Sequence, residues 1–236
     1  MNKKLVTTGL LSGILATGAA SAEVVSVGPV SGIWTSASPA DAVSGVDTNE
    51  ISWGDEDSSS YVFEGQGATG DTNVDFPDEE FRFDLGTFTH NNFSITGTAL
   101  DTAQLQVDTV LTIDGTDRDI TSVFTFDHVE TQNNADPCFG DQTPNAQGCP
   151  DRVTFSVNEA SSDSVVIGGR RYEIGLTGFQ DNGDIAEVFW TDEGEVNVAT
   201  LRGVVQGSEI PVPATLPLYG LGLAGLGLAA ARRRRH

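Results

Sequence analysis

Alternation of apolar and polar residues is the dominant pattern in this chain. One face of the run 103–113 carries five residues, namely Leu105, Val107, Thr109, Leu111 and Ile113. Three later runs alternate in the same way, with Ile120, Ser122, Phe124 and Phe126 in the first, Val153, Phe155 and Val157 in the second, and Tyr172, Ile174 and Leu176 in the third. A period of two residues predicts β-strands that bury one face.

Turn-forming pairs separate these runs. Asp114-Gly115, Gly168-Gly169 and Asn182-Gly183 are the residue types that two-residue hairpin turns require. No stretch of residues 23–209 has the period of an amphipathic helix. The pattern predicts one all-β domain over 23–209, an antiparallel β-sandwich of jelly-roll-like form.

The first 22 residues have the order of a secretory signal. Lys3 and Lys4 precede the apolar run 5–19, and Ala20-Ser21-Ala22 is a small-residue cleavage site. The alternative is a membrane anchor, but the run is short for a span. We expect an N-terminal signal helix that is removed, with the mature chain starting at Glu23.

The C-terminus, residues 210–236, has three parts in series. Pro211, Pro213 and Pro217 keep the entry extended, and residues 214–231 carry no charge. As a helix that run is ~27 Å long, barely enough to cross a membrane. It ends in a cluster expected to stay cytoplasmic, Arg232, Arg233, Arg234 and Arg235. A plain tail anchor explains the span and the charges but not the proline-rich entry.

This tail resembles the sorting signals of the PEP-CTERM class, most closely the VPLPA-type variant. The residues that match the motif are Ile210-Pro211-Val212-Pro213-Ala214, and the apolar run and the arginines follow them. The resemblance implies an exosortase-type membrane protease as a partner. It also implies an exported protein that contacts the membrane only through this helix, before processing, and then reaches the cell surface or the extracellular matrix.

The body between the two ends is strongly acidic. Residues 23–209 hold all 34 acidic residues, six arginines and no lysine, a formal charge of −28. This charge excludes nucleic acid as a partner and disfavours anionic lipid surfaces. Two explanations stay open, namely solubility in salty water and binding of divalent cations.

Two cysteines are present in the chain. Cys138 and Cys149 flank a stretch rich in turn formers. In an exported protein this pairing predicts a disulfide that pins the loop. A redox pair is the alternative, although redox pairs usually have two residues between the cysteines.

Residues 50–113 resemble the THxN family of PEP-CTERM proteins, which is related to the choice-of-anchor surface domains. The match rests on Trp53-Gly54, Ser60-Tyr61-Val62-Phe63 and the run FDLGTFTHNN at 83–92, which contains Thr89, His90 and Asn92. Asn91 replaces the aromatic residue usual between the histidine and the asparagine. The resemblance implies surface sorting and no particular reaction.

The strand that carries this motif has two interpretations. On an unbroken strand His90 and Asn92 share a face with Arg82 and Asp84, and Phe81, Phe83 and Leu85 face the core. The exposed polar face would bind a ligand such as a glycan. Alternatively, the histidine ring and the asparagine amide form hydrogen bonds that tie the strand to the adjacent loop. Gly86 is a place where a β-bulge would change the faces.

Catalytic and metal motifs are weak. His128 lies near Asp127 and Glu130, but no nucleophile, paired-carboxylate or zinc motif is recognisable, so we expect no enzyme and no catalytic residue. Among metals, calcium fits best, and otherwise we expect no cofactor. Its weak candidate ligands lie in three oxygen-rich stretches without EF-hand spacing, namely Asp71, Asp75, Asp78, Glu79 and Glu80; Asp114, Asp117 and Asp119; and Asp181 and Asp184.

The leading hypothesis is therefore a non-enzymatic, exported surface or extracellular-matrix protein. The alternative is a carbohydrate-binding module for exopolysaccharide, in which calcium could assist binding. That module needs an exposed aromatic platform, for which Trp34, Trp53 and Trp190 are the candidates, whereas tryptophans in strands are more often core residues.

Overall fold

The computed structural model describes residues 22–157 and 162–211. Within these residues the chain forms strands and one short 3₁₀ turn, η1 (Phe139–Asp141). The strands are β1 (Glu23–Val27), β2 (Ser31–Ser38), β3 (Val43–Ser44), β4 (Glu50–Trp53), β5 (Ser59–Gly65), β6 (Thr72–Val74), β7 (Phe81–Asn92), β8 (Thr102–Ile113), β9 (Thr116–Val129), β10 (Asp151–Val157), β11 (Val165–Ile167), β12 (Arg170–Asp181), β13 (Asp184–Ala186), β14 (Val188–Thr191) and β15 (Glu195–Glu209).

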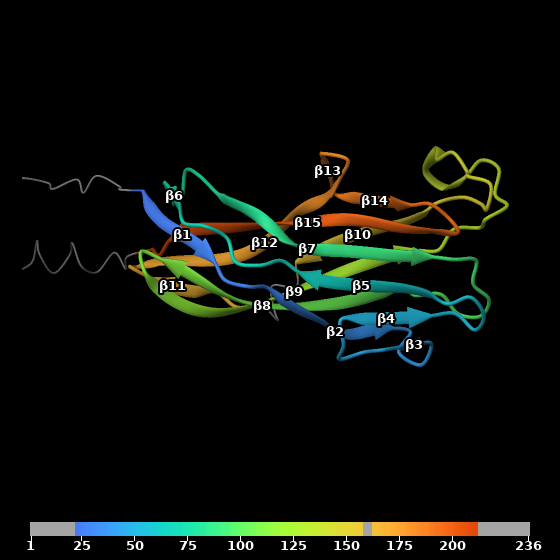
Figure 1. Cartoon of the computed structure of the whole chain (residues 1–236), viewed down its shortest axis with the longest axis horizontal. Helices are drawn as coiled ribbons and strands as arrows, with labels where there is room; N and C mark the ends of the chain where they lie inside the picture. The colour runs from blue at the N-terminus through green and yellow to red at the C-terminus, as the bar shows by residue number, and fades with distance from the viewer. Residues whose placement is uncertain (1–21, 158–161, 212–236) are drawn as a thin grey trace, which may run out of the picture.

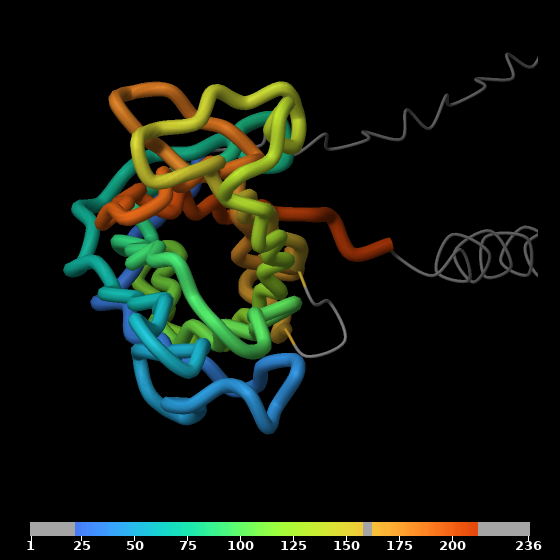
Figure 2. Tube along the Cα trace, turned by 90° about the vertical axis from the view of Figure 1, so that its right-hand side faces the viewer, coloured from blue at the N-terminus to red at the C-terminus, as the bar shows by residue number. Residues whose placement is uncertain are grey.

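The strands form two antiparallel sheets (Figure 1). A seven-stranded sheet has the order β14-β10-β9-β8-β1-β6, with β2 also paired to β8. An eight-stranded sheet has the order β11-β12-β15-β7-β5-β4-β3, with β13 paired to β12. Viewed along the long axis, both sheets curl around a common centre (Figure 2). Buried side chains of both sheets form the core there. The all-β, antiparallel prediction is confirmed.

The three predicted turns are two-residue hairpin loops. Both central residues have positive φ in each of them: Asp114-Gly115, Gly168-Gly169 and Asn182-Gly183. The closing pairs are Ile113 with Thr116, Ile167 with Arg170, and Asp181 with Asp184. Positive φ at both positions gives the twist that neighbouring strands need, so the local sequence fixes these hairpins.

Aromatic side chains join the two sheets. Phe88 of β7 stacks on Phe126 of β9 with ring centroids 5.3 Å apart. The ring centroids of Trp34 in β2 and Tyr61 in β5 are 5.6 Å apart. The two sheets therefore share one core, and the alternating residues predicted to be buried in β8 and β9 point into it.

A bulge in β7 divides that strand into two parts with opposite faces. Leu201 pairs with Gly86 but Arg202 pairs with Asp84, so Leu85 is an extra residue. Before the bulge Phe81, Phe83 and Leu85 are buried, as predicted. After it the even-numbered residues from 86 to 92 are the buried ones. A side chain at Gly86 would meet the Glu64 carbonyl oxygen at 2.5 Å, so close approach requires glycine here.

Both ends of the described body lie at the same end of the molecule (Figure 1). There the guanidinium of Arg170 in β12 forms ion pairs with the carboxylates of Glu23 and Glu209, at N–O distances of 3.2 and 2.6 Å. No helix of the described part is long and apolar enough to cross a membrane. The predicted signal helix and the sorting helix, with Pro213, Ala214 and Arg232 to Arg235, lie outside the described residues.

Candidate functional site

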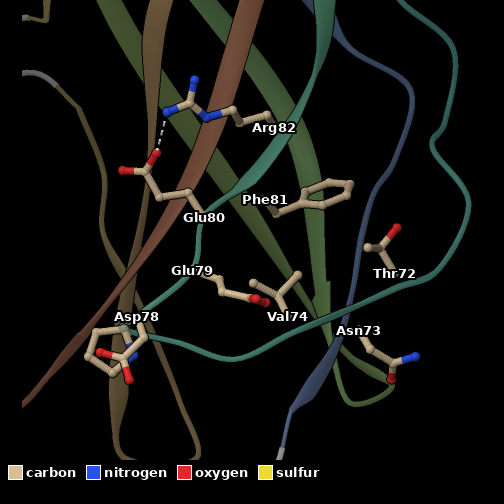
Figure 3. Close-up of a pocket in the computed structure, with 9 residues that line it drawn as sticks. Thr72, Asn73, Val74, Asp78, Glu79, Glu80, Phe81 and Arg82 are labelled. Atoms are coloured by element: carbon tan, nitrogen blue, oxygen red, sulfur yellow. Dashed lines mark hydrogen bonds and ion pairs between the residues drawn. The ribbon is translucent and has the colours of Figure 1, made fainter.

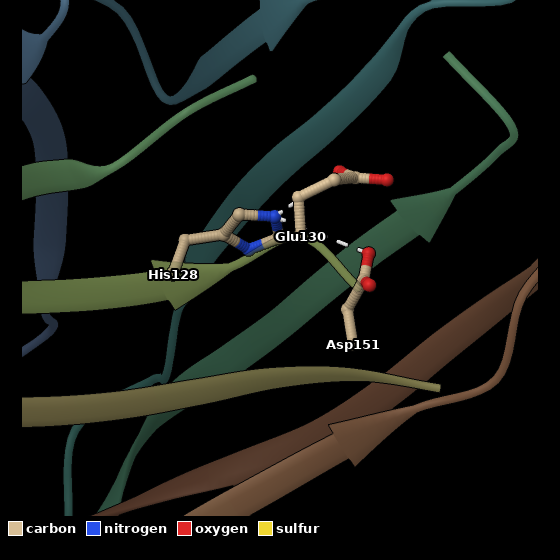
Figure 4. A group of neighbouring side chains, drawn as sticks. All are labelled: His128, Glu130 and Asp151. Atoms are coloured by element: carbon tan, nitrogen blue, oxygen red, sulfur yellow. Dashed lines mark hydrogen bonds and ion pairs between the residues drawn. The ribbon is translucent and has the colours of Figure 1, made fainter. Parts of the chain in front are cut away.

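A buried polar cluster lies at the opposite end of the molecule, where β9 ends and β10 begins. His128 is next to last in β9, Glu130 follows that strand, and Asp151 starts β10. The register pairs Arg152 with Val129, so Glu130 and Asp151 come opposite each other at the next position. Strand alternation places His128 on the core-facing side with Phe126. Figure 4 shows the three side chains meeting.

The three functional groups lie close together. His128 Nε2 is 3.4 Å from Glu130 Oε2 and 3.9 Å from Asp151 Oδ2. The side chains of His128 and Asp151 are 0% exposed, and that of Glu130 is 21% exposed. Within residues 22–157 and 162–211, this is the one group of three histidine, cysteine or acidic side chains with ligand atoms within 4.8 Å of one another.

Neighbouring groups hold the cluster in place. The hydroxyl of Tyr61, from the other sheet, lies 2.6 Å from His128 Nδ1. Asp151 Oδ1 accepts a hydrogen bond from the Thr131 backbone N–H at 2.7 Å. Trp53 packs against His128 with ring centroids 5.3 Å apart. These contacts fix the imidazole and one carboxylate oxygen, and they leave Asp151 Oδ2 without a hydrogen bond to a described residue, 3.9 Å from His128 Nε2.

Burial shifts the acid–base behaviour of all three groups. It raises the pKa of Glu130 to about 7, with the nearby charge of Glu193 acting in the same direction. Burial and then the charge of Glu130 raise the pKa of Asp151 to about 7. Burial lowers the pKa of His128 to about 4. At neutral pH the imidazole of His128 is therefore uncharged. The carboxyl groups of Glu130 and Asp151 are partly protonated and partly ionised.

Several buried oxygens around the cluster make no hydrogen bond to any described residue. They include Asp151 Oδ2, Glu193 Oε2 and Asn92 Oδ1. Asp151, Glu193 and Asn92 are each 0% exposed. An unpaired buried acceptor costs about 1–3 kcal/mol, more if it is charged. A bound cation is one way of satisfying such a set of oxygens.

The histidine and asparagine of the THxN-like motif belong to the interior. His90 and Asn92 are 0% exposed, so of the two interpretations the exposed patch with Arg82 and Asp84 is wrong, because the bulge at Leu85 reverses the faces of the strand. His90 Nδ1 lies 2.9 Å from Thr191 Oγ1, and Asn92 Nδ2 donates to the Thr191 carbonyl at 3.0 Å.

These two hydrogen bonds join the sheets, because His90 and Asn92 belong to β7 and Thr191 ends β14 of the other sheet. The structure thus matches the hydrogen-bonded interpretation, except that the partner is a strand of the opposite sheet and not the adjacent loop. Thr89 points to the opposite face of β7 and is half-buried.

The tryptophans divide into core and surface. Trp34 is 0% exposed and Trp53 is 1% exposed, so neither forms an exposed platform. Trp190 is half-buried, and its ring lies 6.2 Å from that of Phe139, which is 48% exposed. The Arg152 guanidinium lies 5.1 Å from the centre of the Phe139 ring.

The predicted calcium ligands do not converge. Asp71, Asp75 and Asp78 form no three-ligand group, and neither do Asp114, Asp117 and Asp119, all of which are described. Figure 3 shows Asp78, Glu79 and Glu80 pointing in different directions around a surface hollow at the start of β7.

Glu80 in that hollow already has partners, namely Arg82 at 2.9 Å and the Gln206 amide at 2.8 Å. These two hydrogen bonds lower the pKa of Glu80. The carboxylate is thus occupied by protein donors, and the hollow lacks a convergent ligand set.

The disulfide between Cys138 and Cys149 is present, as predicted, with Cα atoms 5.6 Å apart. It closes part of the loop 130–150 that joins β9 to β10. Asn145 in this loop donates to the Glu193 carbonyl at 2.7 Å. The disulfide and the buried cluster therefore belong to the same end of the molecule.

No protein-family model matches the chain, and no curated protein matches it in sequence.

Proposed function

We propose that this chain is a non-enzymatic, exported surface or extracellular-matrix protein, delivered by a C-terminal sorting signal. The observation that carries the proposal is the disulfide Cys138–Cys149. Disulfides persist in oxidising compartments outside the cytosol. The signal-like start, the sorting-like tail and the acidic, lysine-free body support the same destination.

The arrangement of the body fits attachment at one end. β1 begins and β15 ends on the same side of the molecule, and the disulfide-bonded loop lies at the far side (Figure 1). A tail that leaves from β15 would hold the body with this loop directed away from the membrane. A sandwich architecture is part of the proposal, supported by the common core of the two sheets. Jelly-roll-like connectivity stays a prediction.

A non-enzymatic role is supported by the burial of the polar cluster. His128 and Asp151 have 0% exposed side chains, so a substrate would reach them only after a rearrangement of the residues around them. We infer that the cluster contributes to binding and stability rather than to turnover.

We expect the mature protein from its native host to lack residues 214–236. An extended, proline-rich entry before a minimal apolar span is suited to proteolysis, and glycines at 220, 222, 225 and 227 weaken the helix. Intact-mass measurement of the cell-derived protein checks this expectation. Replacing Pro211 and Pro213 with alanine should leave unprocessed protein in membranes. A mature form that retains Arg232 to Arg235 would mean a permanent tail anchor.

Carbohydrate binding is the second candidate function. It is favoured by the surface pair Trp190 and Phe139, with Arg152 over the latter ring. One exposed ring and one half-buried ring beside a hydrogen-bond donor suit the mixed apolar and polar faces of a sugar. We propose exopolysaccharide as the ligand class.

For this second function, Trp190→Ala and Phe139→Ala should each weaken binding of host exopolysaccharide roughly two- to tenfold. Val166, which is 50% exposed, is a matched control because Val166→Ala also removes an exposed apolar side chain. Affinity electrophoresis against the isolated polysaccharide measures the change. Equal retardation of the wild type and both aromatic variants would eliminate this function.

A further inference from the structure

The His128, Glu130 and Asp151 group closes the base of the loop 130–150. Glu130 and Asp151 stand at the two ends of this loop, and His128 faces both of them. We propose that these three side chains bind a divalent metal ion, with Zn²⁺ preferred over Mn²⁺, Ca²⁺ and Mg²⁺. This inference goes beyond surface sorting and does not depend on it.

The spacing of the donor atoms suits a small, four-coordinate ion. Two ligands that each lie ~2.1 Å from zinc at the tetrahedral angle are ~3.4 Å apart. The distance from His128 Nε2 to Glu130 Oε2 is 3.4 Å, and that to Asp151 Oδ2 is 3.9 Å. The Glu130 and Asp151 oxygens lie within 4.8 Å of each other, so binding would draw the Asp151 side chain inward, and a water molecule would take the fourth position.

A second observation independently points to a cation. Asp151 is 0% exposed, and its Oδ2 makes no hydrogen bond to any described residue, while Oδ1 is occupied by the Thr131 N–H. Glu193 Oε2 is also buried without a hydrogen-bond partner among the described residues. Two carboxyl groups thus lie beside the imidazole, and the charge of a third, Glu193, acts on both of them. Burial of such charge is unfavourable unless it is paired or bound to a metal.

The surroundings of His128 are those of a metal ligand. The Tyr61 hydroxyl contacts Nδ1 at 2.6 Å and so orients the ring with Nε2 toward the carboxylates. A metal-bound histidine donates its other ring N–H, so in the loaded site Nδ1–H would donate to the Tyr61 hydroxyl oxygen and leave the Nε2 lone pair for the ion. Glu130, whose side chain is 21% exposed, provides the route by which an ion enters.

The donor set selects the ion. One imidazole nitrogen and two carboxylates suit Zn²⁺ and, more weakly, Mn²⁺, in keeping with the general order of divalent affinities. Ca²⁺ takes six to eight oxygen ligands, and Mg²⁺ demands an octahedron of oxygens. The proposed ion therefore differs from the calcium expected from the exposed aspartates.

Titration calorimetry on the purified chain tests the proposal, with the disulfide intact, no polyhistidine tag and bound metal removed by chelation. Zn²⁺ should bind saturably with one ion per chain and raise the melting temperature by mass action. Ca²⁺ and Mg²⁺ should give no saturable binding at this site. Asp151→Asn and Glu130→Gln should each weaken Zn²⁺ binding at least about tenfold, the lower bound found for groups that only support a ligand.

Asp119→Asn is the matched control, because it removes one acidic charge from an exposed position of β9 and should leave the affinity unchanged. If Asp151→Asn fails to fold, Glu130→Gln decides the question, since Glu130 is partly exposed and lies outside the strands. Absence of saturable Zn²⁺ binding would overturn the proposal, as would wild-type affinity in Glu130→Gln. Neither outcome bears on tail processing, so the two proposals fail separately.

Discussion

Replacing Trp53 with alanine should lower the free energy of unfolding by about 3–5 kcal/mol, the range for truncating a large buried aromatic residue. Trp53 is 1% exposed and packs against Tyr61, His90 and His128, with ring centroids 4.8, 5.6 and 5.3 Å away. Its Nε1 makes no hydrogen bond to a described residue, so the substitution removes packing alone. The cavity would open beside the buried cluster.

Trp190→Ala is the matched control for this prediction, since it makes the same change at a half-buried position. Its cost should be less than half that of Trp53→Ala, because less apolar surface is lost from contact. Urea unfolding of both variants, followed by circular dichroism, gives the comparison. Similar midpoints for the two variants would show that Trp53 is not the core residue that the structure indicates.

Much of the fold can be predicted from local patterns. Period-two alternation identified β8, β9, β10 and β12, and residue pairs suited to positive φ identified three hairpins. Both signals are local, because a strand needs one apolar face and a tight turn needs particular residues. The pairing of β1 with β8 and of β7 with β15 joins distant segments, and no local pattern encodes it.

The faces of β7 show where alternation fails. Counting by twos from Phe81 places His90 and Asn92 outside, but the extra residue at Leu85 shifts the count by one. Gly86 was a sequence signal for such a bulge, yet a glycine alone does not determine whether the bulge forms. The neighbouring strands decide it, through the close contact between Gly86 and Glu64.

The buried cluster was visible in sequence only in part. His128 and Glu130 stand two apart and so share a face, whereas Asp151 and Tyr61 reach the site through strand pairing and sheet packing. The exposed aspartates were misleading for a compositional reason, since an acidic chain places carboxylates close in sequence by chance. What distinguishes Asp151 is burial beside a histidine, which requires the tertiary structure.

Loss of the disulfide should lower the free energy of unfolding by up to about 3 kcal/mol. Cys138 and Cys149 are 11 positions apart, and their link restricts the unfolded chain. The folded loop has other anchors, namely the hydrogen bond from Asn145 to the Glu193 carbonyl and that from the Thr131 hydroxyl to the Cys149 carbonyl at 3.2 Å. The native fold should therefore survive reduction, and the effect should fall on stability.

Metal-free protein is the right material for this measurement, because an ion bound by Glu130 and Asp151 would constrain the same loop. Urea unfolding of oxidised and reduced wild-type protein isolates the cross-link, since both cysteine side chains stay in place. The variant with Cys138→Ala and Cys149→Ala should match the reduced protein within the cost of two small buried side chains. Equal midpoints for the oxidised and reduced forms would contradict the prediction, and would mean that the loop is already restricted in the unfolded chain.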